Sequence, residues 1–118
     1  MIFFDFDYER ADTLEDAVAL LARLQGDARA LAGGTDLLPS MRMENIRPGL
    51  LVSLSRIEPG EPETLADGSI RIDALSRLAS LENSSFLRGK VPMLAQSAHV
   101  VGGNQIRQMG TLGGNLCQ

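Results

Sequence analysis

The chain has 118 residues, a formal net charge of −4 and a pI near 4.9. This length suffices for one domain that buries about two thirds of its unfolded surface. The 11 lysines and arginines are scattered along the chain, which argues against a nucleic-acid partner. A single cysteine, Cys117, and a single histidine, His99, exclude a disulfide framework and a protein-built metal site, and they favour a reducing, cytoplasmic setting. Residues 1–4 are apolar but are followed at once by Asp5 and Asp7, so neither a signal peptide nor a membrane span is predicted.

The N-terminal stretch predicts a short strand followed by a helix. Residues 3–8 mix an apolar run with polar alternation, which indicates a strand or an extended lead-in. Thr13 and Asp16 resemble a capping box, and apolar residues then recur at helical spacing until Gly26.

Two further apolar runs, 28–32 and 50–54, predict strands on either side of a short helix from Leu37 to about Arg42. Alternation of strands and helices over residues 3–54 indicates a βαβαβ-type unit with parallel pairing.

A glycine-rich turn, Leu31–Leu38, lies between the second of these runs and the short helix. Glycine accepts positive φ and lets a ligand approach the backbone without meeting a Cβ atom. Where such a turn opens a helix, the first N–H groups have no helical partner and favour a phosphate. We expect Gly33 and Gly34 to form this turn and Asp36 to cap the helix rather than to touch phosphate.

A second unit is predicted after residues 58–63, which contain two prolines, a glycine and three glutamates and read as a linker. Residues 65–72 predict a hairpin around an Asp-Gly turn. Ser76 is expected to cap a helix that breaks at residues 83–85, and a further helix is expected over residues 91–101.

Gly110–Asn115 is predicted to be a second glycine turn that exposes backbone N–H groups and has the hydroxyl of Thr111 at its start. Two such loops suggest one ligand held from both sides. The familiar phosphate motifs are absent, since there is no G-x-G-x-x-G and Gly89-Lys90 is followed by Val91 rather than by serine or threonine.

No residue stands out as catalytic or as a metal ligand. Arg107, just before the second motif, could neutralise a phosphate, but it is interpreted as a solvated surface residue. His99 is interpreted as a packed or surface helix residue and Cys117 as a buried small hydrophobe. The carboxylates are dispersed, so the chemistry visible in the sequence is binding, and any reaction has to come from a bound cofactor.

The pairing of Ala32–Leu38 with Gln105–Leu116 resembles the FAD-binding medium subunit of molybdenum hydroxylases. That family includes xanthine dehydrogenase, carbon monoxide dehydrogenase and 4-hydroxybenzoyl-CoA reductase. Thr35–Pro39, Leu65–Ser69 and Asn115–Gln118 look most like the beta subunit of the last of these.

The resemblance implies an α+β fold of the vanillyl-alcohol-oxidase (PCMH) type, with FAD between two subdomains. Residues 1–57 would form the N-terminal FAD-binding subdomain, residues 58–63 a linker, and residues 64–118 the start of a second, incomplete subdomain. The cofactor-binding residues would come from both loops: Ala32, Gly33, Gly34, Thr35, Asp36, Leu37, Thr111, Gly113, Gly114 and Asn115.

The implied role is electron transfer by FAD between iron–sulfur clusters and an external donor or acceptor. Partners would be a molybdopterin-binding large subunit and a [2Fe-2S] small subunit. Members of the family continue well beyond the second motif, so this chain is expected to be C-terminally truncated. Two alternatives stay open: a cofactor-free interaction or scaffold fragment of such a complex, and an ADP-type nucleotide-binding domain.

Overall fold

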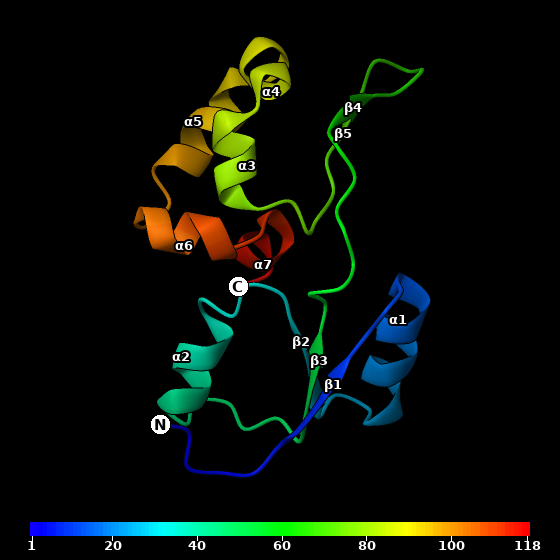
Figure 1. Cartoon of the computed structure of the whole chain (residues 1–118), viewed down its shortest axis with the longest axis vertical. Helices are drawn as coiled ribbons and strands as arrows, with labels where there is room; N and C mark the ends of the chain where they lie inside the picture. Colours follow the sequence, from blue (N-terminus) through cyan, green and yellow to red (C-terminus); the bar gives the residue numbers. More distant parts are fainter. The chain divides into compact units, whose positions relative to one another are not determined.

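The computed structural model describes residues 1–118 and divides into two compact units, Met1–Glu58 and Pro59–Gln118 (Figure 1). This division falls within the segment 58–63 that the sequence analysis assigns to a linker. Each unit has its own hydrophobic core. None of the helices combines the length and apolarity that crossing a bilayer requires.

The first unit is a three-stranded parallel sheet with one helix in each crossover, as the sequence predicts. Its strands lie in the order β1-β3-β2, and β3 is buried at all of its positions. In chain order the elements are β1 (Asp7–Arg10), α1 (Leu14–Arg23), β2 (Ala28–Leu31), α2 (Leu37–Arg42) and β3 (Leu50–Ser53).

The strand order places the two helices on opposite faces of this sheet. The first crossover passes over β3 to reach β2, and the second returns to the centre. Two right-handed crossovers in opposite directions must use opposite faces, and α1 and α2 indeed flank the sheet from its two sides (Figure 1).

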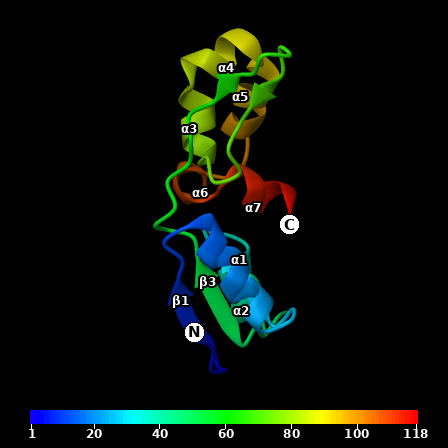
Figure 2. The ribbon, with the colours of Figure 1, turned by 90° about the vertical axis from the view of Figure 1, so that its right-hand side faces the viewer.

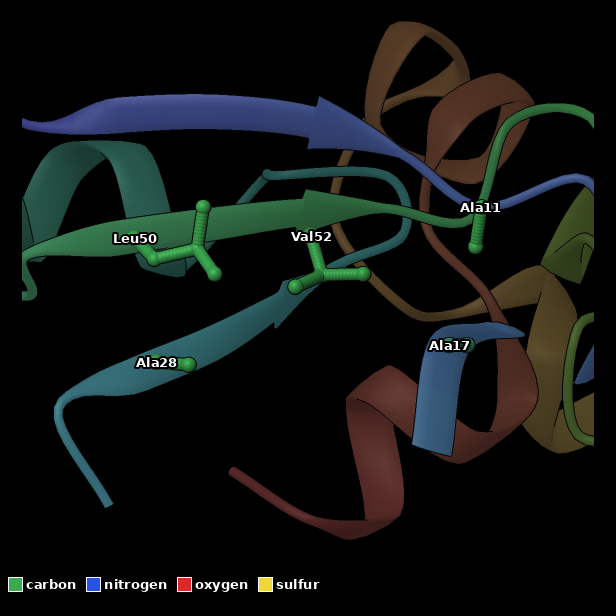
Figure 3. Packing of buried hydrophobic residues seen from close by; sticks show 5 residues of the cluster. All are labelled: Ala11, Ala17, Ala28, Leu50 and Val52. Atoms are coloured by element: carbon green, nitrogen blue, oxygen red, sulfur yellow. The ribbon is translucent and has the colours of Figure 1, made fainter. Parts of the chain in front are cut away.

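One face of the sheet packs against α1. Leu50 and Val52 of β3 point to this side together with Ala28 of β2, and Ala17 of α1 lies with them (Figure 3). The alanines let the helix approach closely. Because side chains alternate along a strand, Leu51 and Ser53 face the opposite side.

Local signals define most of these boundaries. Thr13 caps α1 by accepting a hydrogen bond from the N–H of Asp16 at 3.1 Å, as the capping-box pattern predicts. The helix expected from Leu37 to Arg42 is confirmed. However, β1 begins at Asp7 rather than at residue 3, and before it Phe4 and Phe6 pack on one another with ring centroids 6.0 Å apart.

The second unit is a two-stranded hairpin followed by five short helices. Strands β4 (Glu63–Thr64) and β5 (Ile70–Arg71) pair in an antiparallel manner, and the predicted turn contains Gly68 with φ of +84°. The helices are α3 (Leu78–Asn83), α4 (Ser85–Lys90), α5 (Pro92–His99), α6 (Asn104–Met109) and α7 (Leu112–Leu116). Helix α5 packs against both α3 and α4 (Figures 1 and 2), and the three helices enclose a core of Leu78, Leu81, Leu87, Ala95 and Ala98.

The expectation that Ser76 caps a helix is wrong. The residue at the cap position of α3 is Arg77, and the backbone of Ser76 is engaged elsewhere: its carbonyl accepts from the N–H of Leu112 at 2.9 Å. Ser84 provides the break that the sequence predicts, since it ends α3 and its hydroxyl caps α4 by accepting from the N–H of Leu87 at 3.2 Å.

Helix α7 is joined to the segment that precedes α3 by a row of backbone hydrogen bonds. Besides the bond from Leu112 to Ser76, the N–H of Gly113 donates to the carbonyl of Ala74 at 2.7 Å. A Cβ atom on Gly113 would lie 2.9 Å from the Cβ atom of Ala74 and 3.0 Å from its carbonyl oxygen. Glycine is therefore needed at position 113 for packing.

A partly buried ion-pair cluster ties α3, α5 and α6 together. The Glu82 carboxylate accepts from Nδ1 of His99 at 2.6 Å and from Nε of Arg107 at 2.9 Å, and Arg107 also donates to the carbonyl of Gly102 at 2.9 Å. The side chains of Glu82 and Arg107 are only 15% and 13% exposed, so the surface role expected for Arg107 is wrong. The hydrogen bond from His99, followed by the interactions with Arg107, lowers the pKa of Glu82.

Replacing the packed glycine should destabilise the second unit, whereas a glycine in open space should tolerate the same change. Gly113→Ala is expected to lower the free energy of unfolding by about 1–3 kcal/mol because the methyl group overlaps Ala74. Gly89 lies in α4 with nothing within 4 Å of its Cβ position, so Gly89→Ala should raise the free energy of unfolding by about 0.5–1 kcal/mol. Urea unfolding followed by circular dichroism measures both, and equal effects would contradict the packing role.

Acid should destabilise the chain partly through Glu82. Because the folded state holds the pKa of Glu82 below its ordinary value of 4.5, the carboxylate stabilises the fold above that pH, and this contribution is lost as the pH falls below it. The urea concentration at the midpoint of unfolding should therefore fall less for Glu82→Gln than for the wild type as the pH is lowered from neutral to acidic. The matched control is Glu61→Gln, whose side chain forms no ion pair and whose variant should keep the wild-type decline.

Candidate functional site

The first glycine motif lies where the backbone of β2 leaves the parallel sheet. Residues 32–36 follow the carboxyl end of β2 and lead into α2. The last hydrogen bond of this sheet edge runs from the N–H of Leu54 to the carbonyl of Leu31 at 2.9 Å. Ligands of open parallel sheets bind outside the carboxyl ends of the strands, so the loop has the expected place for a binding site.

In this loop the carbonyl of Gly34 bonds internally, whereas the N–H groups of residues 32–35 have no hydrogen-bond partner. The carbonyl of Gly34 accepts from the N–H of Leu38 at 3.1 Å. No hydrogen bond of the structure begins at the N–H groups of Ala32, Gly33, Gly34, Thr35 or Leu37. Because unpaired backbone donors are costly when water is excluded, a cluster of this kind is suited to the oxygens of a bound anion.

Gly34 permits this backbone conformation. Its φ of +71° lies in the left-handed region that side chains disfavour. A Cβ atom there would lie 3.0 Å from Cδ1 of Leu38 and 3.1 Å from Cδ1 of Leu31. Both the conformation and the surrounding side chains therefore require glycine.

The expected capping role of Asp36 is wrong. Asp36 occupies the cap position of α2, but its carboxylate makes no hydrogen bond to the first helical turn. The reason is its backbone: φ of −113° and ψ of −40° are already helical, whereas Thr13 caps α1 from the extended conformation, with φ of −134° and ψ of 167°. A side-chain cap needs the extended geometry.

The second glycine motif lies in the other unit and differs in its hydrogen bonding. The N–H groups of Leu112 and Gly113 donate to Ser76 and Ala74, and the N–H of Gly114 donates to the Thr111 hydroxyl at 3.2 Å. The expectation that this loop exposes its backbone donors is therefore wrong, because Thr111 starts a helix there despite the glycine pair. Thr111 is 7% exposed, while Gly114 and Asn115 are exposed.

The sequence analysis missed a polar group at the carboxyl edge of the first unit. Ser53 is buried at 3% exposure, and its hydroxyl donates to Oγ of Ser55 at 3.0 Å. Tyr8 is half exposed. Its pKa is lowered chiefly by a hydrogen bond with Ser53 and, to a smaller extent, by one with Arg10. In the sequence, only the alternation of side chains along strands indicates this group, because it places Tyr8 and Arg10 on the same face of the sheet as Ser53.

Other reactive groups form no site. The structure contains no group of three histidine, cysteine, aspartate or glutamate side chains that could hold a metal ion. Cys117 is exposed, so the expectation that it is buried is wrong.

Comparison with known proteins identifies close relatives of this chain. The carbon monoxide dehydrogenase medium chain of Afipia carboxidovorans is 41% identical over 117 residues, and the xanthine dehydrogenase FAD-binding subunit of Escherichia coli O157:H7 is 40% identical over 116 residues. A solved structure of carbon monoxide dehydrogenase from Hydrogenophaga pseudoflava matches with a TM-score of 0.87 and 32% identity.

These matches cover almost all of this chain and a smaller part of the relatives. The two sequence relatives align with 98% and 97% of the chain, which spans 40% and 39% of their own lengths, and the structural match covers 98% of this chain and 40% of the other. The family model for the FAD binding domain in molybdopterin dehydrogenase matches residues 4–118. The chain therefore belongs to the family of FAD-binding domains of molybdopterin dehydrogenases.

Proposed function

We propose that this chain binds FAD through its first glycine loop and belongs to the electron-transfer subunit of a molybdenum-containing hydroxylase or dehydrogenase. The observation that carries the proposal is the set of unpaired N–H groups on Gly33, Gly34 and Thr35, in a chain of this family. Three neighbouring donors suit the pyrophosphate of FAD, whose oxygens are strong acceptors.

The residues of the loop would bind and orient the cofactor. The N–H groups of Gly33, Gly34 and Thr35 would donate to phosphate oxygens, and Gly34 would hold this backbone in the positive-φ conformation that side chains disfavour. Ala32, Asp36 and Leu37 would contribute backbone contacts on either side. FAD, when bound, supplies the redox chemistry.

The second motif is proposed as a smaller contribution to the same function. Thr111, Gly113, Gly114 and Asn115 stay predicted contacts, and of these the side chain of Asn115 is exposed. On this proposal, residues 1–57 and 64–118 are parts of two FAD-binding subdomains in a fold of the vanillyl-alcohol-oxidase (PCMH) type.

The proposed partners rest on the family resemblance, and the names of the relatives support a role as one subunit among several. Those names describe a medium chain and an FAD-binding subunit of multi-subunit dehydrogenases. We propose a molybdopterin-binding large subunit and a [2Fe-2S] small subunit as partners, with FAD passing electrons between the clusters and an external donor or acceptor in the cytoplasm. The closer likeness to 4-hydroxybenzoyl-CoA reductase stays a prediction.

A matched pair of glycine variants tests the site. Gly34→Val strains the backbone that carries the unpaired donors and pushes a branched side chain against Leu31 and Leu38, so it should raise the Kd for FAD about tenfold or more. Gly26 also has positive φ, +100°, but it precedes β2 at the other end of that strand, with nothing within 4 Å of its Cβ position. Gly26→Val therefore introduces the same backbone strain and should leave the Kd unchanged.

Flavin fluorescence during titration measures both constants, and circular dichroism shows whether each variant folds. A folded Gly34→Val variant with the wild-type Kd would remove the loop from the site. Equal Kd values for ADP and FAD in the wild-type chain would favour the ADP-type nucleotide-binding domain instead.

A further inference from the structure

The first loop has no positive charge of its own for a diphosphate. Its donors are uncharged N–H groups, and Asp36 adds a carboxylate next to them. This inference rests on the proposed FAD site. The pyrophosphate of FAD carries two negative charges. A cation near the loop would offset the charge of the diphosphate and strengthen the hydrogen bonds to phosphate.

Most arginines of the first unit are already engaged or lie elsewhere. Three form ion pairs with carboxylates: Arg23 with Glu9, Arg47 with Glu44, and Arg56 with Asp12. Arg29 donates to the carbonyls of Gly26 and Ala28 at the amino end of β2, and Arg42 lies in the last turn of α2, away from the loop. Arg10 is the remaining arginine of this unit, and it forms no ion pair with a carboxylate.

The register of the sheet places Arg10 level with the start of the loop. Arg10 on β1 and Leu31 on β2 are both paired with Ser53 of the central strand. Two strand spacings separate them, about 10 Å between backbones. The first loop begins directly after Leu31, so an arginine side chain and a diphosphate together span this separation.

Arg10 also faces the correct side of the sheet. Alternation puts Arg10, Tyr8 and Ser53 on the face opposite to Leu50 and Val52, which pack with Ala17 of α1. The first loop leads into α2, which lies on that same opposite side (Figure 1).

The side chain of Arg10 is held in place while remaining exposed. Its guanidinium carbon lies 5.8 Å from the centre of the Tyr8 ring, within the range of a cation–π interaction. Because Tyr8 fixes the guanidinium before a ligand arrives, less side-chain entropy is lost on binding.

We propose that Arg10, held by Tyr8, is the cation that neutralises the diphosphate of the cofactor bound at the first loop. Arg10 lies on β1, at one edge of the sheet, and the loop follows β2, at the other edge, so the ligand would extend across the end of β3 to meet the guanidinium.

Titration of the 118-residue chain with FAD and, separately, with ADP tests this proposal. ADP has the same diphosphate and no flavin. Arg10→Gln should raise the Kd for both ligands about 10- to 100-fold and reduce the dependence of Kd on salt concentration, because a charge-assisted contact is lost. Arg10→Lys keeps the charge and should restore most of the affinity.

The matched control is Arg23→Gln, which removes the same charge from the α1 side of the sheet and should leave both Kd values within threefold of wild type. Equal Kd values for folded Arg10→Gln and Arg23→Gln would overturn the role of Arg10 and leave the FAD site standing. A wild-type chain that binds neither ligand would overturn the proposed function and this inference together. Binding of ADP but not FAD, weakened by Arg10→Gln, would support the role of Arg10 while contradicting the flavin site.

Discussion

The hydrogen bond between the N–H of Leu54 and the carbonyl of Leu31 is the last one that β2 makes with its neighbour, and the proposed site depends on it. Up to this bond the backbone of β2 is held by the sheet. Beyond it, Gly34 turns the chain with positive φ into α2, and the N–H groups of Gly33, Gly34 and Thr35 have no acceptor. A loop fixed at both ends by regular structure presents its donors in a set geometry, which reduces the entropy lost when an anion binds.

The two glycine motifs show that similar sequences can use glycine for different physical reasons. In the first motif, Gly34 supplies a backbone conformation, and neighbouring donors are left unpaired. In the second, Gly113 supplies space against Ala74, and its N–H is already bonded to that residue. The first motif is therefore suited to hold an anion, whereas the second chiefly joins α7 to the segment before α3.

Sequence patterns predicted the features that depend on local chemistry. The cap at Thr13, the bounds of α2, the parallel strands and the hairpin turn follow from hydroxyl caps, apolar periodicity and glycine. The failure at Asp36 has a local cause, its own helical backbone conformation, whereas two others involve contacts distant in sequence. Arg77 takes the cap position of α3 while the carbonyl of Ser76 bonds to Leu112, and Arg107 is partly buried because it meets Glu82, 25 residues away. The relation of Arg10 to the first loop required the strand order β1-β3-β2, which no local pattern reveals.

Amide hydrogen exchange, followed by NMR on the ¹⁵N-labelled chain with and without saturating FAD, tests the central claim most directly. The account predicts that the amides of Gly33, Gly34 and Thr35 exchange rapidly in the free chain and become protected when FAD binds, because each then has a phosphate oxygen as acceptor. The amide of Gly113, already bonded to Ala74, should be protected in both states. Saturation with FAD without any gain in protection at residues 33–35 would contradict the account.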